Sequence, residues 1–314
     1  MTNYITGMNQ LLAEHTKAVP NAFIFGQNIN SGTFISGLSK NLSAHETSHI
    51  VNTPNCEYSM CGIGFGTMMN GGRAIYYAKQ LDFMLLGMDQ FVNTLNYIKV
   101  APMPAELGSF SIVLITCDQG FQGPQSSFNG FGDMCSMARF PGFPLMSKQQ
   151  ADMVLRTQLA APGFRIISLS QRLFRNEILD LPILASAPDC SWFQYSDGAD
   201  ATIVSFNFSL PQAVELRQKL EEKGKSAALF QVSFAEKYDW SAIARSVAKT
   251  KRLVVIDDSK SVHLPGQGLI SDLLESGQSF QATVVRREGV DWGMTDDVMP
   301  VDYSSLLTRL NANG

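Results

Sequence analysis

The chain has 314 residues, of which 45% are hydrophobic and 17% charged, and its formal net charge is −4. This composition excludes disordered and fibrous proteins and indicates a globular protein of about two domains. The basic residues cluster only at 249–252 and 286–287. The chain therefore lacks the basic surface that nucleic acids and anionic membranes require, and small-molecule chemistry is favoured.

Apolar strand-like runs alternate with amphipathic helical patterns along the chain, which is typical of α/β layering. A long glycine-rich loop is expected between 116 and 148, with no regular element in it. The patterns of the first part predict, in chain order, helix 2–18, strand 22–25, helix 57–70, strand 73–78, helix 85–100, strand 111–116, helix 148–159 and strand 165–169.

The stretch 181–198 is strand-poor and irregular, and it is interpreted as a linker. We therefore predict two doubly wound α/β domains, residues 1–185 and residues 186–314. After the linker the alternation resumes with strand 201–206, a helix to 224, strand 226–231, a helix from 239, strand 253–256, a helix from 266 and strand 282–285.

The N-terminus and the cysteines indicate the compartment. The first ten residues, MTNYITGMNQ, are not a basic-then-apolar signal sequence, and no apolar run approaches the roughly 20 residues that span a bilayer. The five cysteines are odd in number and scattered, and none of them forms a C-x-x-C motif. We expect a cytoplasmic protein with free thiols.

The segment HETSHIVNTPNCE, residues 45–57, contains two glutamates that point to incompatible chemistries. Its first five residues satisfy H-E-x-x-H, which on a helix would present two imidazoles to zinc with Glu46 as the base. The chain has four histidines, and the next one after His49 is His263. Pro54 would also end such a helix early. A polar surface segment is the favoured interpretation, and we predict no metal site in this chain.

Glu57 opens an apolar segment that contains Gly62-x-Gly64-x-Gly66. These glycines do not fit a dinucleotide-binding motif, because the spacing is wrong and they lie within a predicted helix. They fit close packing better, since Gly62 and Gly66 would share a helix face that another backbone can approach. Glu57 is then a polar group directed inward. It is either a functional carboxylate or an acid favoured by the helix dipole.

The stretch NTPNCEYSMCGIGFGTMMNGGRAIYYAKQLDFMLLGMDQFVN, residues 52–93, resembles the pyrimidine-binding segment of the β subunits of 2-oxo-acid dehydrogenase first components. It is similar more broadly to transketolase-type thiamine-diphosphate enzymes, including the C-terminal-half subunits of two-subunit members. Further segments extend the resemblance over nearly the whole chain, namely 22–28, 201–204, 251–257 and 299–303. The resemblance implies a pyrimidine-binding domain followed by a transketolase C-terminal-type domain.

The resemblance also implies a role for Glu57 and Phe83. Glu57 matches the family glutamate that shares a proton with a pyrimidine nitrogen of thiamine diphosphate, which produces the imino form that deprotonates the thiazolium carbon. Phe83 matches the aromatic residue that packs on the pyrimidine ring. The implied reaction cleaves or forms a C–C bond next to a carbonyl group of a 2-oxo acid or a ketose.

Two family positions differ in this chain. Asn28 stands where the family holds an acid in the first turn. Phe128 or Asn129 stands where the family holds a histidine, counted back from Pro141-Gly142. Asparagine forms hydrogen bonds but cannot relay a proton at neutral pH. Asn28, Phe128 and Asn129 are therefore expected to bind the cofactor or to shape a pocket for a different acceptor.

The chain contains no G-D-G…N motif, which in this family holds Mg²⁺ and the diphosphate. The resemblance therefore implies an α-type partner subunit that carries Mg²⁺ and shares the cofactor. We expect an α2β2 heteromer with the glycine face of the Glu57 helix near a two-fold contact. The alternative is a non-catalytic scaffold or regulatory subunit that retains the fold. The sequence does not identify the substrate.

Overall fold

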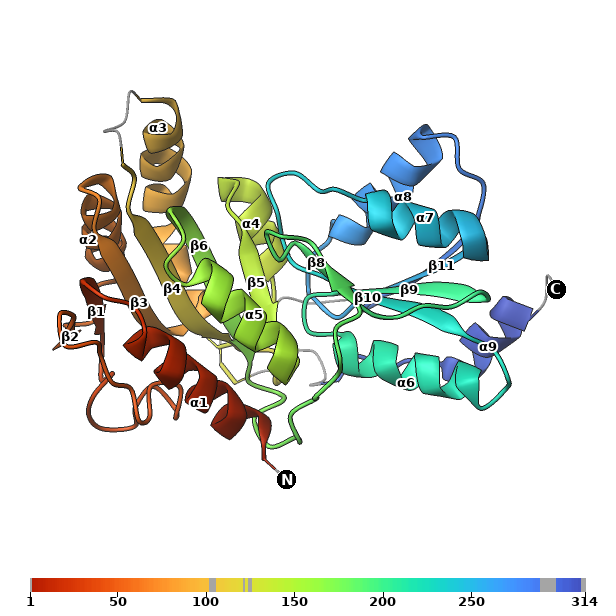
Figure 1. Ribbon diagram of the computed structural model, residues 1–314, viewed down its shortest axis with the longest axis horizontal. Helices are drawn as coiled ribbons and strands as arrows, with labels where there is room; N and C mark the ends of the chain where they lie inside the picture. Colours follow the sequence, from red (N-terminus) through yellow and green to blue (C-terminus); the bar gives the residue numbers. More distant parts are fainter. Residues whose placement is uncertain (1, 102–105, 121, 124–125, 289–297, 312–314) are drawn as a thin grey trace.

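The computed structural model describes residues 2–101, 106–120, 122–123, 126–288 and 298–311, which form two α/β halves side by side (Figure 1). Each half has a six-stranded sheet with helices on both faces. The predicted fold class, two doubly wound α/β domains, is confirmed.

The first sheet has the strand order β2-β1-β3-β4-β6-β5, and all of its strand pairs are parallel. Every residue of β4 is buried, as expected for a parallel strand that helices cover on both faces. Helices α1 and α5 cover one face, whereas α2, α3 and α4 cover the other (Figure 1). The strands are β1 (Ala22–Gly26), β2 (His49–Asn52), β3 (Arg73–Gln80), β4 (Ser109–Thr116), β5 (Gly142–Leu145) and β6 (Gly163–Ser170). The helices are α1 (Tyr4–Lys17), α2 (Glu57–Met69), the 3-10 helix η1 (Leu81–Gly87), the π-helix η2 (Gln90–Thr94), α3 (Leu95–Val100), α4 (Phe131–Ala138) and α5 (Lys148–Gln158).

The second sheet has the order β12-β11-β9-β10-β8-β7. Its first four strands are parallel, and β8 and β7 extend the edge in antiparallel pairing. Helices α6 and α9 lie on one face, and α7 and α8 lie on the other (Figure 1). The strands are β7 (Ala185–Ser186), β8 (Trp192–Ser196), β9 (Ala201–Phe206), β10 (Ala227–Val232), β11 (Arg252–Asp257) and β12 (Gln281–Val285). The helices are α6 (Leu210–Glu221), α7 (Ser241–Thr250), α8 (Pro265–Glu275) and α9 (Tyr303–Asn311).

Several elements differ from the sequence prediction. The stretch expected to be a linker contains β7 and β8, which are short and pair antiparallel at the sheet edge. The patterns also do not predict β2, α4, β5 or α9. The exposed edge strand β2 and the eight-residue α4 have too few residues to establish a clear periodicity. The helix predicted over 85–100 consists of a 3-10 helix, a π-helix and a short α-helix.

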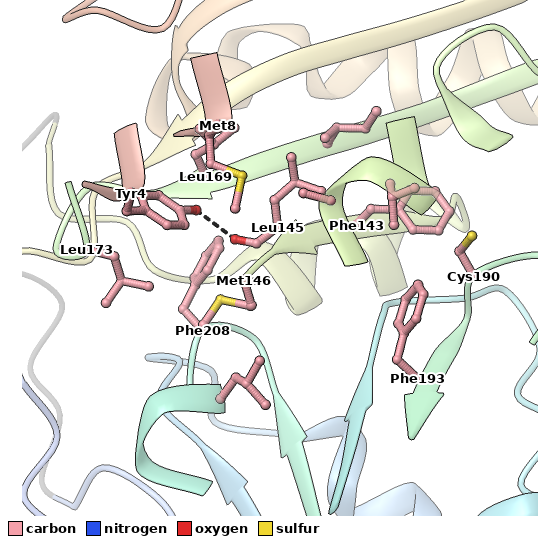
Figure 2. Close-up of a cluster of buried hydrophobic side chains, with 14 of the residues drawn as sticks. Tyr4, Met8, Phe143, Leu145, Met146, Leu169, Leu173, Cys190, Phe193 and Phe208 are labelled. Atoms are coloured by element: carbon pink, nitrogen blue, oxygen red, sulfur yellow. Dashed lines mark hydrogen bonds between the residues drawn. The ribbon is translucent and has the colours of Figure 1, made fainter. Parts of the chain in front are cut away.

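The two halves share one hydrophobic core (Figure 2). Tyr4 of α1 donates a hydrogen bond to the carbonyl oxygen of Leu145 in β5 at 2.6 Å, and Phe208 of the second half lies beside them. Gly142 and Phe234 exchange two backbone hydrogen bonds of 3.0 and 2.8 Å across the interface. The relative position of the domains is therefore determined by packing as well as by polar contacts.

The prediction of free thiols is confirmed: all five cysteines are unpaired, and Cys56 is the exposed one. Within the described ranges, no helix combines the length and the apolar character needed to cross a membrane.

Candidate cofactor site

Three of the predicted site residues lie just beyond the carboxyl ends of neighbouring strands. Strand β1 lies between β2 and β3 in the first sheet. Asn28 follows β1, Glu57 follows β2, and Phe83 follows β3. The chain passes from β1 to β2 on one side and from β3 to β4 on the other, so a topological switch point lies between β1 and β3, and open α/β sheets bind their ligands at such points.

Glu57 is the first residue of α2, and its side chain is only 5% exposed. Within the described part of the chain, its carboxylate has no hydrogen-bond or ion-pair partner. Burial, and then the nearby Glu57 charge, raise the pKa of the Cys61 thiol. The pKa of the Tyr76 phenol is raised by burial, and the charges of Cys61 and Glu57 add to this effect. The N-terminal end of the helix dipole favours a negative charge at this position.

Gly64 explains how the helix that begins with Glu57 approaches the sheet. A Cβ atom added at Gly64 would overlap the ring of Phe110 in β4, so α2 packs closely there. Gly62 has only the Gln90 side chain nearby, and Gly66 has nothing within 4 Å. The close contact within this chain is therefore at Gly64, and the expected role of Gly62 and Gly66 in a subunit contact stays a prediction.

Phe83 lies in η1 and is partly buried against the core beneath α2. The preceding residue, Asp82, is buried and accepts hydrogen bonds from the backbone amides of Ser127 and Phe128 at 2.9 and 2.8 Å. Burial raises the pKa of the Asp82 carboxyl, and the two amide hydrogen bonds oppose this shift. Its second oxygen, Oδ2, is buried without a hydrogen-bond partner. Ser127 and Phe128, at the family histidine position, are thus held by Asp82, the residue directly before Phe83.

Asn28 is exposed and has a φ of 56°, which is the left-handed backbone region. Asparagine tolerates this conformation better than most residues other than glycine. The preceding Gly26 also has a positive φ, and a side chain there would collide with the backbone of Tyr77. Asn28 therefore fits a tight turn that directs the chain away from β1 at the switch point.

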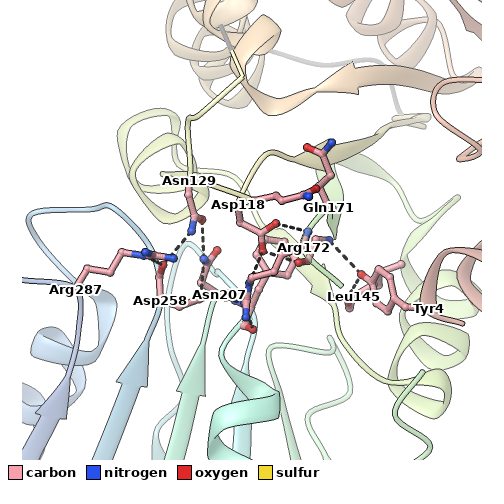
Figure 3. A network of polar contacts seen from close by, with 12 residues as sticks. Tyr4, Asp118, Asn129, Leu145, Gln171, Arg172, Asn207, Asp258 and Arg287 are labelled. Atoms are coloured by element: carbon pink, nitrogen blue, oxygen red, sulfur yellow. Dashed lines mark hydrogen bonds and ion pairs between the residues drawn. The ribbon is translucent and has the colours of Figure 1, made fainter. Parts of the chain in front are cut away.

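Phe128 and Asn129 lie next to each other but have different surroundings. Phe128 is 7% exposed and belongs to the core that Phe83 packs against. Asn129 is fully buried, and its side chain contacts the second domain (Figure 3). Its Nδ2 donates to the Asp258 carbonyl oxygen at 2.9 Å, and its Oδ1 accepts from Asn207 at 2.8 Å. A cofactor-binding role for either residue stays a prediction.

An ion-pair cluster that the sequence patterns did not identify joins the two sheets (Figure 3). The Arg172 guanidinium lies 2.6 Å from Asp258 and 3.5 Å from Asp118, and both carboxylates are fully buried. Asp258 also accepts hydrogen bonds from the Phe208 backbone amide and the Asn207 side chain. Asp118 follows β4 and Asp258 follows β11, so the only sequence signal is their place after buried strands.

The second sheet has a switch point of its own, between β9 and β11. Residues of the first domain fill this edge, because Arg172 and Asn129 contact Asp258 directly beyond β11. A ligand site of the Rossmann type is therefore blocked in the second domain, and the remaining candidate is the switch point of the first sheet, near which Glu57 lies.

The H-E-x-x-H motif is not helical in this structure. Glu46 and Thr47 lie in a turn, and His49 begins β2. His45 forms a hydrogen bond of 2.9 Å with the Thr47 side chain. In the part of the chain that the structure describes, no group of three or more His, Cys, Asp or Glu residues is arranged to hold a metal.

Comparisons with known proteins agree with the fold and with the resemblance read from the sequence. Residues 193–297 match the family "Transketolase, C-terminal domain". The chain is 24% identical to a protein from Oryza sativa subsp. japonica, "Pyruvate dehydrogenase E1 component subunit beta-1, mitochondrial". That alignment covers 96% of this chain and 81% of the relative.

Two solved structures share the fold. "Split gene transketolase, inactive beta4 tetramer" superposes with a TM-score of 0.63 at 14% identity, over 91% of this chain and 89% of that one. Transketolase from Campylobacter jejuni superposes with a TM-score of 0.68 at 12% identity, over 98% of this chain and 44% of that one. The resemblance to a β-type transketolase-like subunit is confirmed.

Proposed function

We propose that this chain, a transketolase-like protein related to pyruvate dehydrogenase β subunits, is the β-type subunit of a thiamine-diphosphate-dependent enzyme. The reaction cleaves or forms a C–C bond next to a carbonyl group, by decarboxylation of a 2-oxo acid or by ketol or acyl transfer. The observation that carries the proposal is Glu57, a buried residue near the switch point of the first sheet, whose carboxylate forms no hydrogen bond or ion pair with the described residues.

The residues at this edge suit an aminopyrimidine ring. The Glu57 carboxylate forms no hydrogen bond with the described residues, so it is available to accept one from a donor of a ligand. Thiamine diphosphate held by these residues would supply the carbon nucleophile for the substrate carbonyl group. Glu57 would share a proton with a pyrimidine nitrogen and so set the protonation state of the ring. Phe83 offers a ring face for stacking, and the Asn28 amide can donate or accept a hydrogen bond at the edge.

The diphosphate end of the cofactor requires a second chain, because the G-D-G…N motif is lacking in this one. The partner would be an α-type subunit that holds Mg²⁺, in an α2β2 assembly. Large apolar side chains are exposed on α2, η1, α3 and α4, and they would suit a subunit contact. They are Tyr58, Ile63, Leu85, Leu86, Tyr97, Val100 and Met137. The cytoplasmic location stays a prediction.

A non-catalytic scaffold or regulatory subunit is the second candidate. It is favoured by the absence of a histidine between His49 and His263 and by the Asn129 side chain, which is committed to the interface with the second domain. Neither Phe128 nor Asn129 can transfer a proton at neutral pH. In such a subunit the fold would be kept for assembly alone.

The test is the activity of the complex that co-purifies with this chain, assayed with thiamine diphosphate and Mg²⁺. The substrates are pyruvate, a branched 2-oxo acid and a ketose phosphate. We expect Glu57→Gln to lower kcat by about 10²- to 10⁴-fold, the usual contribution of general acid–base catalysis, while the complex still forms.

Glu46→Gln is the matched control, because Glu46 is an exposed glutamate eleven positions earlier, outside the proposed site. It should leave kcat unchanged. Equal activities of wild-type and Glu57→Gln complexes would contradict the catalytic assignment and favour the scaffold.

A further inference from the structure

The segment Ser127–Asn129 is held from both domains at once. On its inner side, Asp82 accepts the backbone amides of Ser127 and Phe128 at 2.9 and 2.8 Å. From the second domain, the Lys260 ammonium donates to the Ser127 carbonyl oxygen at 2.9 Å. The Lys260 backbone amide donates to the Asn129 carbonyl oxygen at 2.7 Å. This three-residue segment therefore donates two hydrogen bonds to Asp82 and accepts two from Lys260, two residues far apart in the sequence.

The second domain holds Lys260 and the end of this segment in a common network, of which Figure 3 shows Asn129, Asp258 and Arg287. The Asn129 side chain donates to the Asp258 carbonyl oxygen at 2.9 Å. Arg287, which follows β12, donates to the same oxygen at 2.7 Å. Lys260 is two residues beyond Asp258, in the loop that leaves β11. The position of Lys260 is thus determined by the second sheet.

Charge favours this arrangement. Asp82 is 7% exposed and lies within electrostatic reach of the Lys260 ammonium, which opposes the burial that raises the pKa of Asp82. The pKa of Lys260 is lowered by burial and by Arg287, and Asp82 opposes this shift. The attraction between the two charges adds to the hydrogen bonds that both residues form with Ser127.

This segment occupies the family histidine position but contains no group that transfers a proton, so it can act at the site only through its shape. Asp82 connects it directly to Phe83, the residue that would stack on the cofactor. We propose that Lys260 is a positioning residue: the second domain uses it to fix Ser127–Phe128 and, through Asp82, the place of Phe83 in the cofactor site. This inference rests on the proposed function for its link to the cofactor.

The first experiment uses the purified chain without cofactor. Hydrogen–deuterium exchange is measured over the peptide that contains Ser127 and Phe128, in the wild type, Lys260→Met, Lys260→Gln and Lys260→Arg. Lys223→Met is the control, because Lys223 is an exposed lysine of the same domain. We expect roughly tenfold faster exchange in Lys260→Met, an intermediate effect in Lys260→Gln, and wild-type exchange in Lys260→Arg and the control. Unchanged exchange in Lys260→Met would overturn the inference.

The second experiment uses the complex that co-purifies with this chain. We expect Lys260→Met to raise the apparent Kd of thiamine diphosphate by about tenfold, while Lys260→Arg restores it to within about twofold of the wild type. Faster exchange together with an unchanged Kd would make Lys260 a purely structural residue and overturn the positioning role.

The two proposals fail in distinguishable ways. A wild-type complex that binds no thiamine diphosphate contradicts the proposed function and removes the cofactor link of Lys260 with it. A wild-type complex that binds the cofactor, with a Kd that does not respond to Lys260→Met, contradicts the positioning role alone.

Discussion

Gly64 and Gly66 offer a matched test of how α2, the helix that begins with Glu57, packs on the sheet. A Cβ added at Gly64 would lie 2.5 Å from Phe110 Cε1 and closer to two other ring atoms. Ordinary carbon contacts are about 3.5–4.0 Å, so the helix or the ring has to move. Phe110 is fully buried against the rings of Phe65 and Phe164, with centroids 5.1 Å away in both cases, and has little freedom to shift. At Gly66 nothing lies within 4 Å.

The comparison of Gly64→Ala with Gly66→Ala isolates the packing term. Both substitutions gain about 1 kcal/mol of helix propensity. The forced overlap at Gly64 costs about 1–3 kcal/mol, as is usual when a methyl group is inserted into a filled core. The gain is common to both variants. Gly64→Ala should therefore be less stable than Gly66→Ala by about 1–3 kcal/mol.

The assay is urea unfolding of the purified chain, followed by far-UV circular dichroism. We expect Gly64→Ala to unfold at a lower urea concentration than Gly66→Ala, with a similar slope m. Equal midpoints would refute the close approach of α2 to Phe110. In the assembled complex the Gly66→Ala variant also tests the subunit face, because a methyl group at a tight contact should weaken assembly while leaving the isolated chain stable.

Two further predictions concern the junction of the domains. Arg172→Met leaves the buried carboxylates of Asp118 and Asp258 without their cation, so we expect the free energy of unfolding in urea to fall by about 3–5 kcal/mol. The control Arg175→Met, at an exposed site, should have little effect. Equal losses in the two variants would contradict the role of the cluster. Burial raises the pKa of Asp257 to about 6. The folded state therefore binds this proton more tightly than the unfolded chain does. Protonated Asp257 contributes fully to the free energy of unfolding below about pH 4, and this contribution, up to about 3 kcal/mol, is lost as the pH rises through about 6. Asp257→Asn should flatten this part of the pH–stability curve, and an unchanged slope would show that other carboxyls produce it.

The interior strands were predictable from the sequence for a physical reason. Parallel strands buried on both faces, such as β4 and β9, are mostly apolar along their whole length. Along the chain they alternate with helices that have a polar face. The edge strand β2 and the antiparallel pair of β7 and β8 are short and partly exposed, so their composition resembles that of loops. Periodicity identifies elements with one or two buried faces and misses short, partly exposed strands at the edges of a sheet.

The candidate site was predictable only in part. Glu57 and Phe83 were recognised because they lie in one continuous segment with a distinctive order of proline, glycine and acidic residues. The contact between Asp82 and the Ser127–Phe128 segment was not predictable, because it joins backbone amides that carry no residue-type signal. The role of Lys260 was missed for the same reason, since its acceptor is a carbonyl oxygen.

The sequence by itself determined the layering of two α/β domains, the free thiols and the resemblance that singles out Glu57. These properties depend on composition and on the local order of residues, both of which can be read from the sequence alone. Only the tertiary structure decided that Glu57 lies near the switch point of the first sheet, while Arg172 and Asn129 fill the corresponding edge of the second sheet. That decision depends on which strand ends and loops meet across the domain interface. Such contacts follow from the packing of segments that are distant in the sequence, so residue spacing along the chain does not predict them.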